Sequence, residues 1–206
     1  MATMMDLMLS IVLGGTLMVI VLNANEIAAE NQSVYNGDML VQEMLTSVAQ
    51  VVEGEIRNMG FGVPENKASI LYADTSRMIF LTDLSRSGVS LDTIQYLLGD
   101  TLDLSYTQNE LDRLLYRRVN SQPATQIGAV TIFHLSYITK AGEVLTTPVT
   151  PGRLTEIHVV EVTIEVQNPY AMTRKPGETI GIGERSALYS SSIWQQTRLA
   201  SQNSRR

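Results

Sequence analysis

The 206-residue chain has 15 basic residues, 21 acidic residues and no cysteine. Residues 1–56 contain seven of the acids and no Lys or Arg, so they carry −7, and the rest of the chain, with 15 basic and 14 acidic residues, carries +1. The composition excludes disulfides and thiol chemistry, and it argues against a basic nucleic-acid-binding surface. We interpret the acidic stretch as a solvated helix face.

The first predicted element is an apolar helix. Leu7–Leu22 reads LMLSIVLGGTLMVIVL without a charge, and Met4 and Met5 extend it to 19 residues broken only by Asp6. This length is close to the ~20 residues that cross a bilayer as a helix. A cleavable signal peptide remains the alternative, although no basic residue precedes the run. Neither flank has the Lys or Arg that orients an ordinary membrane anchor.

Three residues interrupt this apolar run. Asp6 is costly at the edge of an apolar helix and needs a partner, for which the free α-amine of a neighbouring chain in a polymer is one candidate. The alternative is that Asp6 lies at the lipid headgroup level or caps the start of the helix. Gly14 and Gly15 mark either close helix packing or a point of local unwinding.

Apolar residues at helical spacing return after Gly37 and predict that the helix continues to Met59. The stripe consists of Val41, Met44, Leu45, Val48, Val51, Val52, Ile56 and Met59. Gly60, Gly62 and Pro64 then predict a stop. A helix over Thr3–Met59 is about 85 Å long at ~1.5 Å per residue. We divide this region, residues 1–60, into an apolar half (1–24) and an amphipathic half (25–60).

Residues 61–206 predict a globular, β-rich head. The expected strands are Met78–Leu84, Thr93–Leu98, Leu114–Val119, Thr131–Ile138, Ile157–Val166 and Ala187–Trp194. A tight turn at Lys140–Glu143 leads into a short VLTT segment, Arg174–Gly183 reads as a loop, and SQNSRR reads as a mobile tail. The order predicts an antiparallel sheet with the amphipathic half of the helix on one face. The fold class is therefore α+β.

No pattern points to catalysis. His134 and His158 lie in strand patterns without the nearby carboxylates that a metal site needs. Gly181-x-Gly183 follows no strand and opens no helix, so it does not indicate a dinucleotide site. Ser190–Ser192 lacks the turn and base of a nucleophile elbow. We therefore predict no enzyme activity, no cofactor and no metal.

The N-terminal segment Ala2–Leu22 resembles the mature N-terminus of type IV pilins and of type II secretion pseudopilins. These begin with a Thr, two apolar residues and an acid before a long apolar helix, and Thr3, Met4, Met5 and Asp6 follow that order. Further segments resemble the minor pilins and pseudopilins with larger heads. These segments are Val51–Gly62 (VVEGEIRNMGFG), Arg77–Leu98, LLYRRV (Leu114–Val119) and Phe133–Glu143.

The resemblance implies removal of a basic leader, a stay in the cytoplasmic membrane, and assembly by the pilus or type II secretion machinery into a filament. It implies that Asp6 neutralises the amine of the next subunit, with Thr3, Gly14 and Gly15 as further assembly residues. The chain departs from the family in having Asp in place of the usual Glu, in lacking Pro in the apolar half, and in lacking paired cysteines in the head. The family register also requires Ala2 as the mature N-terminus.

The function that follows is that of a structural subunit of an extracellular pilus-like filament, which polymerises through its apolar helix and binds no nucleic acid. One alternative is a minor, tip-type pseudopilin of a secretion or pilus machine. Another is a membrane-tethered head that binds or adheres to a ligand.

Overall fold

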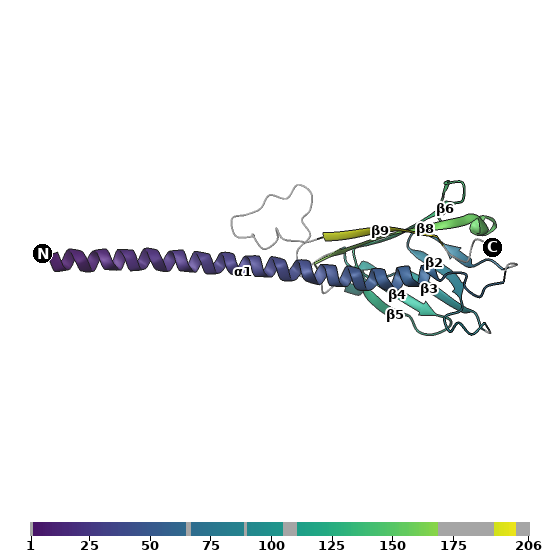
Figure 1. Ribbon diagram of the computed structural model, residues 1–206, viewed down its shortest axis with the longest axis horizontal. Helices are drawn as coiled ribbons and strands as arrows, with labels where there is room; N and C mark the ends of the chain where they lie inside the picture. Colours follow the sequence, from purple (N-terminus) through teal and green to yellow (C-terminus); the bar gives the residue numbers. More distant parts are fainter. Residues whose placement is uncertain (1, 65–66, 89, 105–110, 169–191, 201–206) are drawn as a thin grey trace.

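The structure is a computed structural model that describes residues 2–64, 67–88, 90–104, 111–168 and 192–200. The loop expected at Arg174–Gly183, the residues Ser190 and Ser191, and the expected tail SQNSRR lie outside these residues. A long helix projects from one end of a head built of strands (Figure 1). This arrangement confirms the predicted class, in which a long N-terminal helix is followed by antiparallel β-structure.

The helix α1 runs from Ala2 to Arg57 without a break. Gly14, Gly15 and Gly37 all stay helical, because a glycine weakens a helix by only about 1 kcal/mol against alanine and does not clash with it. The chain turns sharply after α1, where Gly60 (φ 78°) and Gly62 (φ 74°) adopt left-handed conformations. Residues with a Cβ disfavour this region, which explains why the helix ends here.

The head contains two antiparallel sheets. Sheet A has the order β1 (Ile70–Ala73), β2 (Arg77–Thr82), β3 (Asp92–Leu98), β4 (Arg113–Val119) and β5 (Thr125–Val130). Sheet B has the order β7 (Val144–Leu145), β6 (Ile132–Thr139), β8 (Ile157–Gln167) and β9 (Ser192–Ala200). Two short 3₁₀ helices, η1 (Thr101–Leu104) and η2 (Pro151–Glu156), complete the described elements.

The expectation of a single sheet was wrong, and Thr131 shows why. This residue alone separates β5 from β6, and its N–H (2.9 Å) and hydroxyl (3.1 Å) both donate to the carbonyl of Glu165. The chain thus passes from sheet A to sheet B in one step. Strand signals in the sequence give no information about such a change of sheet, since each strand has the same period on either side.

The strand boundaries show where local pattern was insufficient. The sequence pattern missed β1, which has four residues, and β5, which contains Gly128. It also placed the last strand at Ala187–Trp194, whereas β9 continues to Ala200. The reason is that the middle of β9, from Gln195 to Arg198, alternates between exposed and half-buried polar residues, so this part of the strand carries no apolar signal.

The C-terminal half of α1 completes the core of the head. The helix contacts β5, β8 and β9, so it lies between an edge strand of sheet A and an edge strand of sheet B (Figure 1). Gly128 on β5 permits this approach, because a Cβ there would lie 2.5 Å from Cγ2 of Val48. The rings of Tyr96 from sheet A and Phe133 from sheet B lie 6.4 Å apart, which joins the two sheets in the same core.

The predicted apolar stripe is largely the face that α1 buries. Its buried members are Val41, Leu45, Val48, Val52, Ile56 and Met59. Val51 is an exception at 36% exposed, and Met44 is half-buried. Val51 precedes the fully buried Val52. Because successive residues of a helix are rotated by about 100°, Val51 points away from the buried face.

Candidate assembly interface

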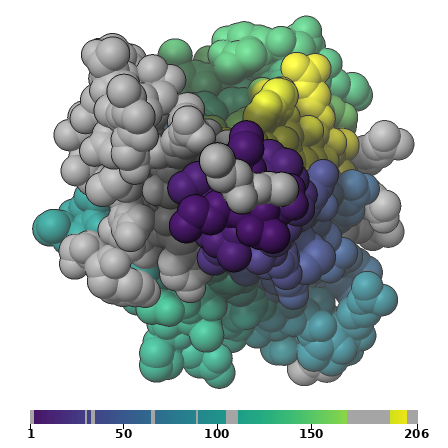
Figure 2. Space-filling view, turned by 90° about the vertical axis from the view of Figure 1, so that its left-hand side faces the viewer, coloured from purple at the N-terminus to yellow at the C-terminus, as the bar shows by residue number. Residues whose placement is uncertain are grey.

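The part of α1 that stands clear of the head is apolar. Within it, Thr3–Ala29 is 27 residues long, and none of its side chains is buried. By length and composition it is sufficient to cross a membrane as a helix. We call Thr3–Ala29 the apolar segment. Figure 2 looks along it and shows it in front of the head.

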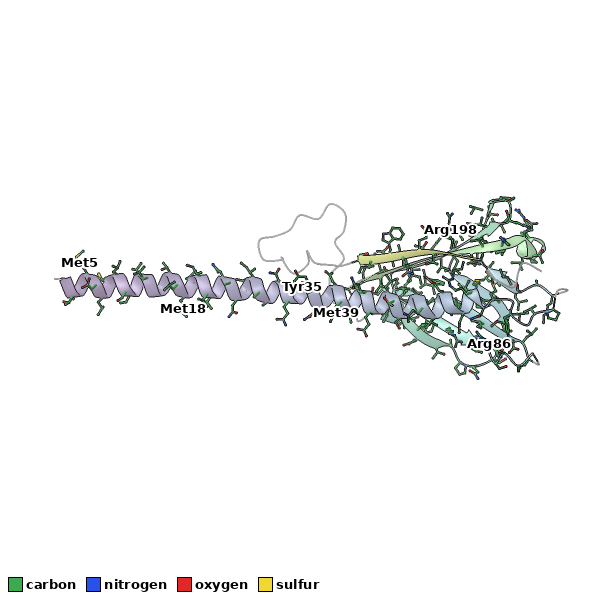
Figure 3. All side chains as sticks on the ribbon, viewed as in Figure 1. Met5, Met18, Tyr35, Met39, Arg86 and Arg198 are labelled. Carbon is green, nitrogen blue, oxygen red and sulfur yellow. The ribbon has the colours of Figure 1, made fainter. Side chains whose placement is uncertain are left out.

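Large apolar side chains cover every side of the apolar segment. Their exposed fractions range from 54% at Leu13 to 74% at Met4 and Met5. Figure 3 shows Met5 and Met18 pointing to different sides of the helix axis. A helix that is apolar all round is stable only when protein or lipid surrounds it. This surface therefore requires a cover.

The hydroxyl side chains of the apolar segment are compatible with burial in protein or lipid. The hydroxyl of Ser10 donates to the carbonyl of Leu7, and that of Thr16 donates to the carbonyl of Leu13, each at 2.9 Å. A hydroxyl satisfied by its own helix does not need water. These two residues therefore add little to the cost of moving the segment out of water.

The four residues singled out from the sequence all lie on the apolar segment. Thr3 and Asp6 are exposed and three residues apart, which places them on the same side of the helix. Asp6 makes no hydrogen bond or ion pair with the residues that the structure describes. Gly14 and Gly15 lie two turns further on, and a Cβ at either would meet nothing within 4 Å. Their roles in assembly remain predictions.

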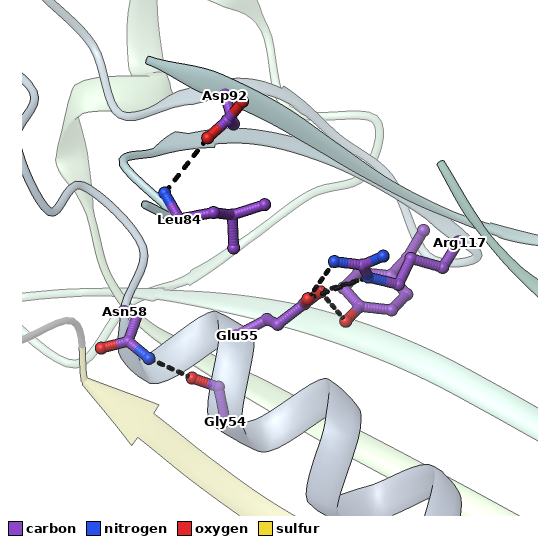
Figure 4. A network of polar contacts seen from close by, with 7 residues as sticks. Gly54, Glu55, Asn58, Leu84, Asp92 and Arg117 are labelled. Atoms are coloured by element: carbon purple, nitrogen blue, oxygen red, sulfur yellow. Dashed lines mark hydrogen bonds and ion pairs between the residues drawn. The ribbon is translucent and has the colours of Figure 1, made fainter. Parts of the chain in front are cut away.

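Two acids at the other end of α1 have a different role, which sequence reasoning missed. Glu55 accepts hydrogen bonds from the guanidinium of Arg117 on β4 at 2.8 and 2.9 Å and from the hydroxyl of Tyr96 on β3 (Figure 4). Burial, reinforced by the negative charge of Glu55, raises the pKa of Tyr96 well above its usual value. Hydrogen bonds to Glu55 raise the pKa of Arg117. This network fixes α1 to sheet A.

Glu53 makes the equivalent connection to sheet B. Its carboxylate accepts hydrogen bonds from Nε2 of Gln195 (2.8 Å) and from the hydroxyl of Thr197 (2.6 Å), both on β9. Arg57, one turn on, lies 3.6 Å from the same carboxylate. We refer to Glu53, Glu55 and these partners as the helix clamp. The interpretation of the acidic stretch as a solvated face is wrong for these two residues.

The described residues contain no group of three His, Asp or Glu side chains arranged to hold a metal ion. His134 is exposed on β6, and His158 is half-buried on β8. Gly181, Gly183 and Ser190 lie outside the described part of the chain.

No family model and no curated protein matches the chain. Among solved structures, the chain is similar to a type IV-like pilin from Thermus thermophilus, with a TM-score of 0.47 and 11% sequence identity. The match covers 80% of this chain and 98% of the other. A likeness of this extent says nothing of function.

Proposed function

We propose that the chain is a structural subunit of an extracellular pilus-like filament and that the apolar segment is its polymerisation element. The observation that carries this proposal is a 27-residue helix, apolar on every side and nowhere buried, that continues directly into a folded head. In this proposal the apolar segment lies in the cytoplasmic membrane before assembly and in the core of the filament afterwards.

The size of the exposed apolar surface supports a structural role. Fourteen large apolar side chains between Met4 and Leu22 are more than half exposed. Burial of each contributes roughly 1.5–3 kcal/mol, so covering all of them contributes on the order of 20 kcal/mol or more. Lipid and neighbouring helices both supply such a cover. Between two apolar surroundings the choice depends on packing and polar contacts rather than on the hydrophobic effect.

In this proposal Asp6 makes burial of the apolar segment in a filament more favourable than its burial in lipid. A carboxylate within an apolar surrounding is costly unless it is paired, and the terminal amine of a neighbouring copy is a cation that such packing brings near. Thr3 lies on the same side of the helix as Asp6, and Gly14 and Gly15 allow neighbouring backbones to approach closely. A filament of helices thus satisfies a charge that a bilayer leaves unpaired.

The test is electron microscopy of surface material from cells that produce the full chain, Asp6→Ala, or a matched control, Glu43→Ala. Glu43 is another exposed acid of α1, on the half that carries the head. We expect filaments from the full chain and the control, few or none from Asp6→Ala, and none from a chain that begins at Asn31.

Two outcomes would contradict this proposal. Filaments at normal levels from Asp6→Ala would refute the pairing of Asp6 with an amine. A full chain that stays in the membrane fraction without filaments would refute polymerisation, and it would favour the tip-subunit or the tethered-head alternative instead.

A further inference from the structure

The end of the head from which α1 emerges carries an apolar surface with one acid at its centre. Ile132 on β6, Glu165 on β8 and Trp194 on β9 are direct neighbours in the strand register. Their sequence neighbours Phe133 and Ile164 are buried in the core, so this row lies on the outer face of sheet B. Ile132 is 43% exposed, and Trp194, the only tryptophan of the chain, is 64% exposed. We call these three residues the proximal patch.

Glu165 is oriented, but its charge is not neutralised. The hydroxyl of Ser192 (2.7 Å) and Nε2 of Gln167 (2.8 Å) both donate to its Oε1. Within the described part of the chain Glu165 makes no ion pair, whereas Glu161, the next acid on the same face, is bound by Arg198 at 2.5 Å. The proximal patch thus presents a fixed carboxylate between two apolar side chains.

The opposite end of the head carries a surface of matching composition and opposite charge. Phe61 and Leu84 are 38% and 42% exposed there. The guanidinium of Arg86 lies 5.9 Å from the centre of the Phe61 ring and makes no ion pair with any described residue. Figure 3 shows Arg86 at the end of the head away from the free end of α1. We call Phe61, Leu84 and Arg86 the distal patch.

Asp83 holds the two loops of the distal patch together. It is only 3% exposed, and its N–H donates to the carbonyl of Phe61 at 2.9 Å. Its carboxylate accepts hydrogen bonds from the hydroxyl of Ser85 (2.9 Å) and the N–H of Gly88 (2.6 Å). Within this loop Arg86 has a φ of 52°, a conformation that is uncommon for a residue with a side chain. The backbone on both sides of Arg86 is therefore fixed by Asp83, which lowers the cost of ordering this backbone in a contact.

We propose that the distal patch of one copy binds the proximal patch of the next, with Arg86 facing Glu165 and Trp194. Each patch has two exposed apolar side chains and one charge, the two charges are opposite in sign, and an arginine fits a tryptophan face as well as a carboxylate. Since the two patches lie at opposite ends of the head, the contact is head-to-tail and leaves a free patch at each end to continue an open polymer. This inference rests on the proposed filament and adds a contact between heads to the contact between helices.

The proximal patch lies at the base of the projecting helix. β9 begins at the end of the head from which α1 emerges, and Trp194 is its third residue (Figure 1). Figure 2 shows β9 beside the helix rather than beneath it. A second head that binds the proximal patch therefore lies alongside the projecting helix.

Cysteine cross-linking tests the contact, because the full chain contains no other cysteine. We expect Leu84→Cys combined with Ile132→Cys, a pair that leaves Arg86 and Glu165 in place, to give a ladder of disulfide-linked dimers, trimers and longer species under mild oxidation. The control combines Lys140→Cys with Ile132→Cys. Lys140 is also exposed, and it lies in the turn that follows the end of β6 away from Ile132. This pair is expected to give no ladder.

Charge exchange provides a second measurement that does not depend on cysteine geometry. Arg86→Glu and Glu165→Arg are each expected to reduce the sedimented polymer on the order of fivefold, and the double exchange is expected to restore most of it. Thermal unfolding of each variant confirms that the head is folded.

The outcomes separate this inference from the proposed function. Filaments that form without a ladder, or that tolerate both single exchanges, would overturn the head-to-tail contact and leave the proposed filament in place. A ladder in membranes without filaments would support the contact and contradict the filament. The absence of both would contradict both proposals.

Discussion

The two halves of α1 belong to one unbroken helix, yet they depend on different surroundings. In the apolar segment Thr3–Ala29 no side chain is buried, whereas from Val41 onward one face of the helix is buried in the core of the head. The first half is apolar all round, and no described residue of the head covers it. The second half has one apolar face, which the two sheets cover, and acids that bind β3, β4 and β9. One half of α1 is therefore part of the core of the head, whereas the other half is a surface that must be covered by lipid or by another protein chain.

The largest difference between the two halves is expected when one aspartate is introduced into either half of α1 in separate variants. Val52 is fully buried, so Val52→Asp is expected to lower the free energy of unfolding of the head by at least about 4 kcal/mol, because an unpaired carboxylate enters the core. Val19→Asp is expected to leave unfolding of the head unchanged and to reduce membrane insertion by roughly 3 kcal/mol. Chemical denaturation and membrane fractionation measure the two effects. Equal effects of both variants on unfolding would remove the distinction between the halves.

The helix clamp should contribute next. Glu55→Ala is expected to lower the free energy of unfolding by about 2–3 kcal/mol, since Arg117 and Tyr96 then lose their partner at a mostly buried site. Glu43→Ala, a change of an exposed acid on the same half of α1, is the matched control with an expected effect below ~0.5 kcal/mol. If both variants unfold alike in denaturant, the clamp does not stabilise the helix against the sheets.

The close approach of α1 to β5 predicts a smaller effect. Gly128→Ala places a methyl group against Val48 and is expected to cost about 1–3 kcal/mol through overpacking. Val48→Ala in the same chain should recover part of this loss by removing the contacting methyl groups. A double-mutant cycle measured by denaturation tests the coupling. Simple additivity of the two losses would show that the two residues do not meet.

The smallest effect is a dependence on alkaline pH. Burial raises the pKa of Tyr96 and of Tyr137 above the usual value of 10.0. Above about pH 10 the unfolded chain releases protons that the folded head retains, so the stabilisation is complete below that pH and is lost as the pH rises further. Each tyrosine contributes a slope of at most about 1.4 kcal/mol per pH unit. Thermal unfolding between pH 9 and 11 should show a shallower decline for Tyr96→Phe than for the unchanged chain, and identical declines would contradict the assignment.

The features that depend on local pattern follow from the amino-acid sequence alone. The apolar run and the helical stripe gave the long helix, Gly60 and Gly62 gave its end, and strict alternation gave β8 almost to its ends. The same apolar run made residues 1–24 a candidate for membrane or filament burial, because composition alone decides which surroundings they tolerate.

Only the tertiary structure decided what depends on residues far apart in the chain. It divided the strands between two sheets at Thr131, placed α1 between β5 and β9, and brought Glu55 to Arg117 across 62 positions of sequence. It also put Glu165 between Ile132 and Trp194 and set Arg86 at the other end of the head. Such pairings arise from strand register and from the packing of whole elements. The period of one segment describes that segment's own faces and carries no information about what covers them.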